Sequence, residues 1–595
     1  MKREEYVLYD GETKLKFAKR LIGAVYGAMC SGVGHFALAR ITTFIGLKYL
    51  AKNQFAKAKN MICGVTKQVC NTHLTTVVTR AIFDYYEKIL KLFPDQNGIL
   101  NLTVIYDGTW KTRGFCSNLG TGVLIDANTG LVIDYECFSK TCVQCTKNRN
   151  KVQKKKMSEQ SYNIWFAKHK NDCTKNFEES SGQMEVEGIK RMFARSIDKY
   201  KFRYTVLIGD GDSKAYNAIL NMNPYGDDFI VKKQECLNHV AKRMGSNLRD
   251  ERNKALTTDE TIKLVNMAQM KSLDPLMKGE TSGTKKTSVT AKASVKRLSA
   301  KSGPAKTKGP IKSLCKSGKS KQIPKNDIPL KKTISMKGKN GLTDRVIDCC
   351  QRYFRKSIID HSTAEMMSKS IWATFLHLTS TDSKPNHSWC KAEWCWHLDW
   401  KKNRDDEEKE FNEEKQKKHE DCRKNSSENA KNFFPSKPST SKKFEPTKKY
   451  PGHDSMKVRI PFEEGSIEYS RVKAVYVKMT DLGLLRRCEG KFTQNANESF
   501  HSRIWSMCPK VDYFSLAQME FAVCQNILIY HMGYELGSLL SYFDIEYTRG
   551  MKMLFSCAEY SRKKVITRKP KKNIKANEKA TKLAYDAGRG DQLKV

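Results

Sequence analysis

The run of residues 102–110, Leu-Thr-Val-Ile-Tyr-Asp-Gly-Thr-Trp, constrains the fold more than any other part of the chain. Its apolar and β-branched side chains favour a buried strand, and a glycine breaks the run directly after Asp107. A second run of this kind, residues 204–212, ends with Asp210 and Asp212 in a glycine turn. We expect two adjacent parallel strands that deliver carboxylates to one sheet edge, where they can hold Mg²⁺ together with a substrate phosphate.

The segments around these runs predict the rest of the sheet. Residues 120–126 and 130–137 have the composition of strands and are joined by a short loop of turn-forming residues. Apolar residues at helical spacing predict a helix over 184–200, a second helix covers about 213–220, and a further strand lies around 229–231. The order strand, strand, strand, helix, strand, helix, strand is that of an RNase H-like fold, a mixed α/β sheet in which the first and fourth strands are neighbours.

A third acid is expected from a later helix that begins near residue 495. Asn495 or Asn497 can cap this helix, and Glu498 falls in its first turn, where negative charge is favoured. The buried side of the helix is predicted to consist of Phe500, Ile504 and Trp505. The alternative for each acid is simpler: an aspartate before glycine is a common turn residue, and a glutamate in a first helical turn is a common cap.

Five motifs resemble the transposase domain of Mutator-like DNA elements, in particular its animal branch. They are Asp107-Gly-Thr-Trp, Met184-Glu-Val-Glu-Gly, Gly209-Asp-Gly-Asp-Ser-Lys-Ala, Glu235-Cys-Leu-Asn-His-Val and Thr493-Gln-Asn-Ala-Asn-Glu-Ser. The resemblance runs in order from about residue 15 to about residue 555, with two insertions. It implies an RNase H-like core with a DDE acid triad that cuts and rejoins element ends. Carried over by motif, the triad is Asp107, Asp210 and Glu498, with Asp212 as a rival for the second position.

The net charge of +43 indicates a polyanionic partner, and nucleic acid is the first choice. Residues 271–340 hold nineteen basic against three acidic residues with almost no aromatics, so we expect disorder there. The basic tail contains two candidate nuclear import signals, at 562–564 and 568–572, although a solvated tail is the alternative. Residues 21–39 lack charge, but their glycines and polar residues make a membrane span a poor interpretation.

The expected organisation of the 595 residues is one elaborated core with insertions. No separate DNA-reading domain is evident, so end recognition is expected to fall to the core and the basic insertions, or the copy is truncated. The expected parts are a helical N-terminal segment (1–98), the first part of the core (99–265) with a zinc-knuckle insertion (142–173), a disordered Lys-rich insertion (266–342), a helical and Cys/His/Trp-rich insertion (343–400), a polar low-complexity insertion that is helix-prone or unfolded (401–455), the C-terminal part of the core with the third acid (456–550) and a basic tail (551–595).

Cysteines and histidines occur at metal-ligand spacings, which fits a reducing nucleus or cytoplasm better than disulfides. One set combines a CxxC knuckle with an i, i+4 pair and predicts a structural zinc site, against free buried thiols. Its residues are Cys142, Cys145, His169 and Cys173. A looser second set, His377, His387, Cys390 and Cys395, is the other zinc candidate, with His397 as a substitute ligand. Four tryptophans are expected to pack around it: Trp389, Trp394, Trp396 and Trp400. A Trp-rich core corner is the alternative.

Cys236 and His239 form the Cys-x2-His signature that Mutator-like transposases carry between the second and third acids. Two donors cannot close a zinc site, so the pair is expected to recruit further ligands, or to place His239 near DNA or the leaving hydroxyl. Cations near the pair suit phosphate contacts or a solvated helical face. They are Lys214, Lys242, Arg243 and Arg249.

The sequence therefore predicts a nuclear, DDE-type DNA transposase that uses Mg²⁺ or Mn²⁺ for catalysis and Zn²⁺ for structure. Its expected partner is double-stranded DNA, in the form of terminal inverted repeats, on which it assembles as a homo-oligomer, with no membrane involved. Two alternatives remain open. One is a domesticated, non-catalytic DNA-binding or chromatin protein, and the other is an RNase H-like structure-selective nuclease.

Overall fold

The computed structural model describes residues 5–10, 13–47, 50–112, 116–211, 213–254, 336–337, 341–428, 444–446, 452–453 and 458–567. Several predicted features lie outside these residues: Asp212, all of the Lys-rich stretch 271–340 except residues 336 and 337, and the import candidate at 568–572. The chain divides into two compact units. The first comprises Met1–Met244, Gln351–Ile371 and Thr480–Val595, and the second comprises Gly245–Cys350 and Trp372–Met479.

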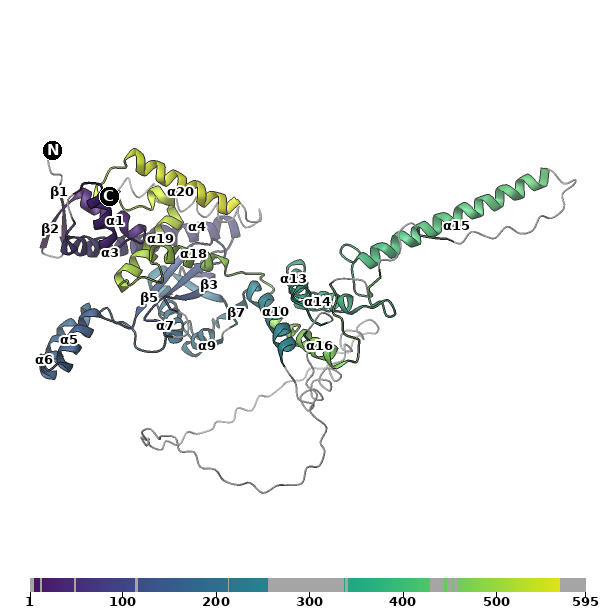
Figure 1. The fold of residues 1–595 in the computed structure, drawn as a ribbon, viewed down its shortest axis with the longest axis horizontal. Coiled ribbons are helices and arrows are strands. Elements are labelled where there is room, and N and C mark those ends of the chain that lie inside the picture. Colours follow the sequence, from purple (N-terminus) through teal and green to yellow (C-terminus); the bar gives the residue numbers. More distant parts are fainter. Residues whose placement is uncertain are drawn as a thin grey trace, which may run out of the picture. The chain divides into compact units, whose positions relative to one another are not determined.

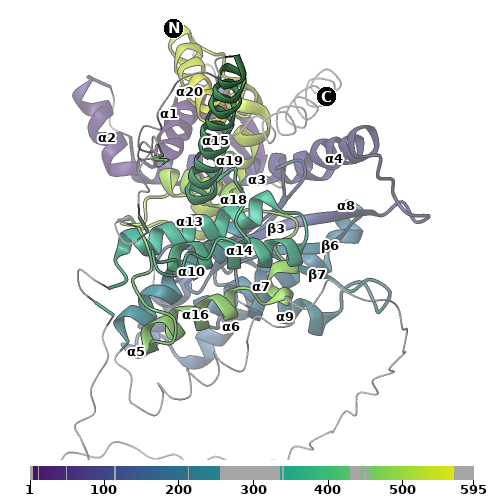
Figure 2. The same cartoon turned by 90° about the vertical axis from the view of Figure 1, so that its right-hand side faces the viewer.

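A five-stranded mixed sheet forms the centre of the first unit (Figures 1 and 2). Its strands are β3 (Leu100–Trp110), β4 (Leu119–Asp126), β5 (Val132–Ser139), β6 (Phe202–Gly209) and β7 (Lys232–Glu235). The order across the sheet is β5-β4-β3-β6-β7. Strand β4 is antiparallel to both β5 and β3, whereas β6 is parallel to β3 and β7 is parallel to β6. The predicted adjacency of the strands that lead to Asp107 and Asp210 is confirmed.

Helices account for most of the remaining first unit. They are α1 (Lys19–Cys30), α2 (His35–Phe44), α3 (Lys52–His73), η1 (Leu74–Val78), α4 (Thr79–Tyr85), η2 (Tyr86–Leu90), α5 (Val143–Gln153), α6 (Glu159–His169), η3 (Lys170–Asp172), α7 (Ser181–Ala194), α8 (Ser196–Tyr200), α9 (Ser213–Met222), α17 (Leu482–Arg486), α18 (Asn495–Met507), α19 (Leu516–Leu536), η4 (Ser541–Phe543) and α20 (Arg549–Thr567). Helices α10 (Leu237–Asn253), α13 (Asp344–Asp360) and α14 (Ala364–Thr379) cross the division between the units, and α15 (Trp396–Glu428) and α16 (Ile467–Met479) belong to the second.

Two sequence predictions need correction. The strand expected around 229–231 begins only at Lys232, because β7 pairs with β6 from that residue onward and leaves Ile230 exposed. The helix expected over 184–200 is interrupted at Arg195, whose guanidinium hydrogen-bonds Asp134 and Glu136 of β5. The segment 21–39 lies within the predicted helical N-terminal segment and forms parts of two helices, α1 and α2, with Gly32 at a positive φ of 69° between them.

A two-stranded hairpin, β1 (Glu5–Asp10) and β2 (Thr13–Ala18), precedes α1 and was not predicted. The polar stretch after residue 400 is helical as far as residue 428, where α15 ends. None of the helices in the described ranges is both long and apolar enough to span a bilayer.

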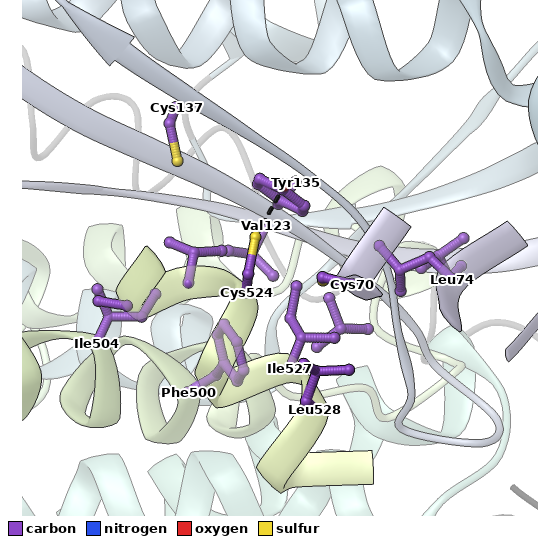
Figure 3. Packing of buried hydrophobic residues seen from close by; sticks show 14 of the residues in the cluster. Cys70, Leu74, Val123, Tyr135, Cys137, Phe500, Ile504, Cys524, Ile527 and Leu528 are labelled. Carbon is purple, nitrogen blue, oxygen red and sulfur yellow. Dashed lines mark hydrogen bonds between the residues drawn. The ribbon is translucent and has the colours of Figure 1, made fainter. Parts of the chain in front are cut away.

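The core lies where helices cover the two faces of the sheet. Strand side chains alternate, so Tyr106 and Phe138 face α7, whereas Tyr135 and Cys137 face the opposite side, where α19 packs. Figure 3 shows this second side, on which α3, α18 and α19 supply Cys70, Phe500, Ile504, Ile527 and Leu528, and Cys524 donates to the Tyr135 hydroxyl over 3.0 Å. This packing fixes α18 against the sheet and so carries its polar residues toward β3.

Two buried histidines connect α3, α19 and β5 within this core. The backbone N–H of Val132 donates to Nε2 of His531 over 3.0 Å, so the ring proton of His531 lies on Nδ1, 3.1 Å from Nε2 of His73. Burial lowers the pKa of His73 to about 4 and holds the pKa of His531 well below its usual range. Both rings are therefore neutral in the folded protein at pH 7.

We expect acid to destabilise the first unit through these histidines. A histidine with a lowered folded-state pKa contributes stability above about pH 6.5 and loses it as the pH falls toward 4. At about 1.4 kcal/mol for each pKa unit, His73 accounts for about 3 kcal/mol. The measurement is the melting temperature between pH 7 and 4.5. The variant His73→Gln should show a weaker pH dependence than the exposed-site control His419→Gln, and equal slopes would contradict the assignment.

Candidate active site and metal centres

Asp107 and Asp210 lie at the same edge of the sheet. The ladder between β3 and β6 ends at Ile105 and Ile208, so Asp107 stands two residues beyond it and Asp210 follows directly after β6. Asp107 lies on the α18 side of β3, since its neighbour Tyr106 faces α7. In α/β sheets the carboxyl ends of parallel strands are the usual place for ligands.

The chain after β7 brings His239 to this edge. The backbone N–H groups of Cys236 and Leu237 donate to the carbonyls of Gly209 and Phe492, which joins the end of β6 to the segment before α18. His239 follows in the first turn of α10. Its Nδ1 lies 3.5 Å from Oδ1 of Asp210 and its Nε2 lies 3.6 Å from Oε1 of Glu498. The ring of His239 therefore lies between two of the three predicted acids.

Hydrogen bonds from α18 to the sheet position Glu498. Gln494 Nε2 donates to the carbonyl of Tyr106 over 3.0 Å, Asn497 Nδ2 donates to the carbonyl of Val123 over 3.0 Å, and Trp505 Nε1 donates to Thr109 Oγ1 over 2.8 Å. The predicted asparagine cap is wrong: Gln494 precedes the first turn, without a side-chain cap, and Asn497 is buried against β4. Phe500 and Ile504 are fully buried as predicted, whereas Trp505 is only partly buried.

The three acids influence one another electrostatically. Burial raises the pKa of Asp107 to about 7, and the charges of Asp210 and Glu498 add to the rise, while His239 opposes it. The side chains of Asp210 and Glu498 are 59% and 52% exposed, against 29% for Asp107. A half-buried carboxylate beside two exposed ones forms a site that a dissolved cation or phosphate can reach.

Cys236 and His239 interact by a hydrogen bond beside the acids. Burial disfavours the Cys236 thiolate, but hydrogen bonds from His239 and from the backbone of Gln494 outweigh it and lower the pKa of Cys236. The hydrogen bond to Cys236 is the main cause that raises the pKa of His239 to about 9, and Asp210 adds to it. A cationic His239 thus faces Asp210 and Glu498 at neutral pH.

Hard oxygen ligands suit Mg²⁺ or Mn²⁺, and the acids fit such an ion in chemistry. Burial is the main cause of the raised pKa of Asp107, and the charges of Asp210 and Glu498, which a divalent cation would neutralise, add to it. The three carboxylates are not among the groups of described residues whose ligand atoms all lie within 4.8 Å of one another; those groups consist of cysteines and histidines. His239 occupies the space between two of the acids, so closing a metal site requires the carboxylates to move toward one another.

Three side chains at this site were not predicted from the sequence to lie there. They are Gln494, His501 and Asn497, the last of which hydrogen-bonds a strand of the sheet. His501 is buried, with Nδ1 3.6 Å from Oδ2 of Asp107, and burial lowers its pKa to about 4. Buried atoms of all three have no hydrogen-bond partner: Gln494 Oε1, Asn497 Oδ1 and His501 Nε2. The one feature of the sequence that could have indicated these residues is the number of polar side chains on a helix that also carries the buried Phe500 and Ile504.

The four predicted DNA-contacting cations have different surroundings. Arg243 is ion-paired to the buried Glu235 over 2.6 Å, and a Cβ at position 211 would lie 2.8 Å from its Nη1, so the glycine turn after Asp210 allows this close approach. Arg249, in the second unit, is paired with Asp344 and Asp348. Lys214 and Lys242 are exposed. Two of the four are thus already engaged with acids.

The first predicted cysteine and histidine set converges. Cys142 Sγ lies 3.3 Å from His169 Nε2, Cys145 Sγ lies 3.5 Å from Cys173 Sγ, and the four ligand atoms lie within 4.8 Å of one another. Burial raises the pKa of Cys142, but hydrogen bonds from the Cys145 backbone, from Thr174 and from His169 lower it to about 5. A thiolate in a Cys₃His group is the donor set that Zn²⁺ prefers.

The second set also converges, within the second unit. Nδ1 of His377 and Nδ1 of His387 are 3.3 Å apart, and Cys395 Sγ lies 3.6 Å and 3.3 Å from them. Cys390 Sγ lies 3.8 Å and 3.5 Å from the same two atoms. Zinc bond lengths of about 2.0 and 2.3 Å place tetrahedral ligand atoms about 3.3 to 3.7 Å apart. The observed separations therefore match a four-coordinate ion.

Residues behind this second set orient His387. Its Nε2 lies 2.6 Å from Nε2 of His453, whose Nδ1 lies 3.4 Å from Asp382. A histidine that binds a metal through one nitrogen commonly hydrogen-bonds through the other, which fixes its tautomer. His397, the predicted substitute ligand, instead stacks on His387 at 4.1 Å between ring centroids. The ligand atoms of His387, His397 and His453 also lie within 4.8 Å of one another, so these three histidines form a further group of possible metal ligands.

The predicted tryptophan packing is largely present. Trp394 and Trp396 contact the ring of His377, and Trp400 contacts that of His397. Trp389 has no ring partner among the described residues.

One comparison with known proteins identifies the family. A protein-family model described as Mutator-like transposase matches residues 7–292, a segment that includes Asp107, Asp210, Cys236 and His239 but ends before Glu498. No curated protein and no solved structure gives a significant match. The matched segment covers the whole central sheet and the first cysteine and histidine set. Residues 7–292 of this chain therefore belong to the Mutator-like transposase family.

Proposed function

We propose that the protein is a DDE-type transposase that cleaves DNA strands at element ends and transfers them to target DNA. The observation that carries the proposal is that Asp107 and Asp210 follow two neighbouring parallel strands and that His239 lies within 3.6 Å of both Asp210 and Glu498. Burial, with a contribution from the charges of Asp210 and Glu498, raises the pKa of Asp107 to about 7. The sheet order, with three antiparallel strands followed by two parallel ones, supports an RNase H-like core.

The acidic and the cationic side chains of the site have different proposed roles. Asp107, Asp210 and Glu498 would supply the oxygen ligands for two Mg²⁺ or Mn²⁺ ions. Such ions, when bound, lower the pKa of an attacking water or 3′-hydroxyl and stabilise the leaving oxygen. His239, cationic beside Asp210 and Glu498, attracts a phosphate and balances their charge before the site is loaded. Gln494 and Asn497 hold the helix that carries Glu498.

Structural Zn²⁺ in the two cysteine and histidine sets is a separate part of the proposal. Soft thiolates and imidazoles favour Zn²⁺, whereas the acids favour harder ions. The net charge of +43 supports double-stranded DNA as the partner, with terminal inverted repeats as the specific substrate. We further propose a nuclear location and a homo-oligomer assembled on DNA, as the family resemblance implies.

The proposal is tested with purified full-length protein, Mg²⁺ or Mn²⁺ and duplexes that contain the element ends next to unrelated duplexes. We expect nicking at the end sequence and joining of the released 3′-end to a second duplex. Glu498→Gln should reduce both reactions by about a hundredfold or more, because changes even to residues behind a metal ligand typically reduce activity 10- to 100-fold. Glu546→Gln, at an exposed acid without a recorded partner, is the matched control.

Each other outcome points to a defined alternative. Cleavage of branched or single strands without joining indicates a structure-selective nuclease. Tight DNA binding with no cleavage under any metal condition indicates a non-catalytic DNA-binding protein. Cleavage that is equal in the Glu498→Gln and Glu546→Gln proteins would remove Glu498 from the mechanism.

A further inference from the structure

Residues 143–172, which lie between the first and last members of the first cysteine and histidine set, form a helical hairpin with almost no core of its own. Helices α5 and α6 pack against each other (Figure 1). No residue of α5 is buried, and His169, itself one of the four ligand-set residues, is the only buried residue of α6.

The cysteine and histidine set supplies most of what holds the hairpin closed. Cys142 and Cys145 lie at the start of α5, and His169 and Cys173 lie at the end of α6 and just beyond it. The other recorded links are the ion pair of Arg149 with Glu159 at 2.7 Å and the stacking of Arg149 over Tyr162. Exposed contacts of this kind contribute about 1 kcal/mol or less each. The two helices therefore depend on a metal for a fixed arrangement.

The hairpin is also strongly basic on the outside. Residues 143–172 contain eight basic and two acidic residues, and all eight basic side chains are exposed. Arg149 is paired with Glu159, and the structure records no ion pair for the other seven. These seven are Lys147, Lys151, Lys154, Lys155, Lys156, Lys168 and Lys170.

Three of these lysines follow one another along a single side of the hairpin. Lys147, Lys151 and Lys154 are spaced by four and three residues, which places them on one helical face or directly at its end. They extend over about 10 Å of helix axis, a length over which one DNA strand presents about three phosphates. A row of unpaired cations of this length matches a nucleic-acid backbone in both charge and spacing.

We propose that residues 143–172 form a metal-folded arm that binds the phosphate backbone of duplex DNA. The lysines of the arm are separate from the candidate active-site residues Asp107, Asp210, Glu498 and His239. The arm binds the DNA backbone without reading the base sequence. The identity of the polyanion as duplex DNA rests on the proposed function. The metal orders the two helices, and the lysine row then meets the phosphates without an additional folding cost at the moment of binding.

The test measures DNA affinity as a function of salt in the full-length protein. The arm variant carries Lys147→Glu, Lys151→Glu and Lys154→Glu, and the control carries Lys402→Glu, Lys409→Glu and Lys417→Glu on the exposed helix α15. Both change the net charge equally. Affinity is measured by fluorescence anisotropy with a 30-base-pair duplex of arbitrary sequence (about three helical turns). The slope of log affinity against log salt should be shallower by about 2 to 3 for the arm variant than for the control, since each lost phosphate contact reduces the slope by about 0.9.

A second variant tests the metal dependence. Cys145→Ser combined with Cys173→Ser leaves every lysine in place but removes two of the four ligands. We expect lower zinc content, faster tryptic cleavage within 143–172 and a weaker affinity for the same duplex. Equal salt slopes for the two lysine variants would overturn the proposal. If the arm variant lost affinity only for single-stranded RNA or only for an acidic protein, the proposal would be overturned in favour of that partner.

These outcomes are distinct from those for the proposed function. Binding of the arbitrary duplex requires no cleavage, so a protein that fails to cut DNA can still show the arm effect. A protein that cuts and joins element ends but has identical salt slopes in both lysine variants would retain its proposed function and lose the arm.

Discussion

Replacing Asp107 with asparagine is expected to abolish strand cleavage while making the folded protein more stable at alkaline pH. The carboxylate is the most buried of the three acids, and an amide cannot supply the same negative oxygen to a divalent cation. Cleavage should fall by about a hundredfold or more, beyond the range typical for residues behind a metal ligand. Asp228→Asn, at an exposed acid after α9, is the control and should cleave normally.

The stability effect follows from the sign of the pKa shift. An aspartate whose folded-state pKa is raised from about 3.8 to about 7 favours folding below pH 4, and this contribution is lost as the pH rises through 7. Above pH 7 the ionised Asp107 therefore destabilises the native state. At about 1.4 kcal/mol for each unit, the effect is at most about 4 kcal/mol.

Melting temperatures of the wild type and of Asp107→Asn at pH 5 and pH 8.5, without divalent metal, measure this effect. The melting temperature of the variant should rise relative to that of the wild type as the pH increases from 5 to 8.5. Addition of Mg²⁺ should reduce the difference, because the ion binds the native wild-type site and stabilises it by mass action. A variant that cleaves normally, or that loses stability relative to the wild type at pH 8.5, would contradict the place given to Asp107.

Loss of the second cysteine and histidine set is expected to have the largest effect on stability. Structural zinc contributes about 10 kcal/mol or more to the folding of small zinc domains. Cys395 is fully buried, and its set joins α14, the loop before α15 and, through His387, His453. Cys395→Ser should therefore unfold much of the second unit and release one zinc. The control is Cys557→Ser, at an exposed cysteine of α20, which should retain all zinc.

The two sets should respond differently when they are disrupted. Cys142→Ser should also release one zinc but should loosen only the α5–α6 hairpin, since α5 contributes no buried residue to the core. Elemental analysis of protein prepared without added metal is expected to find two zinc ions for each chain, and hydrogen exchange can locate the loosened segment. Metal-free protein with unchanged stability in both variants would leave these cysteines as buried thiols. Addition of Mg²⁺ should rescue neither variant.

Local patterns in the sequence were sufficient for the elements that bear the site. The apolar run ending at Asp107 and the similar run ending at Asp210 predicted β3 and β6, because side-chain pattern and glycine breaks are properties of a few neighbouring residues. The adjacency of the two strands was predicted from the order of the elements, which is that of an RNase H-like fold. The same holds for Glu498 in the first turn of α18 and for both metal-ligand sets, whose members lie close along the chain. Where local periodicity was ambiguous, as for β7 and at Arg195, the prediction failed: pairing with β6 set the start of the strand, and an ion pair with Asp134 and Glu136 marks the helix break.

Only the tertiary structure decided how the polar groups face one another. His239 lies between Asp210 and Glu498, Gln494 bonds the carbonyl of Tyr106, and His453 bonds His387, although these partners are separated by tens to hundreds of residues. Local propensity specifies which face of a helix or strand is apolar. Which buried polar atoms become neighbours depends on how those faces pack, because each must find a hydrogen-bond or charge partner once water has been removed.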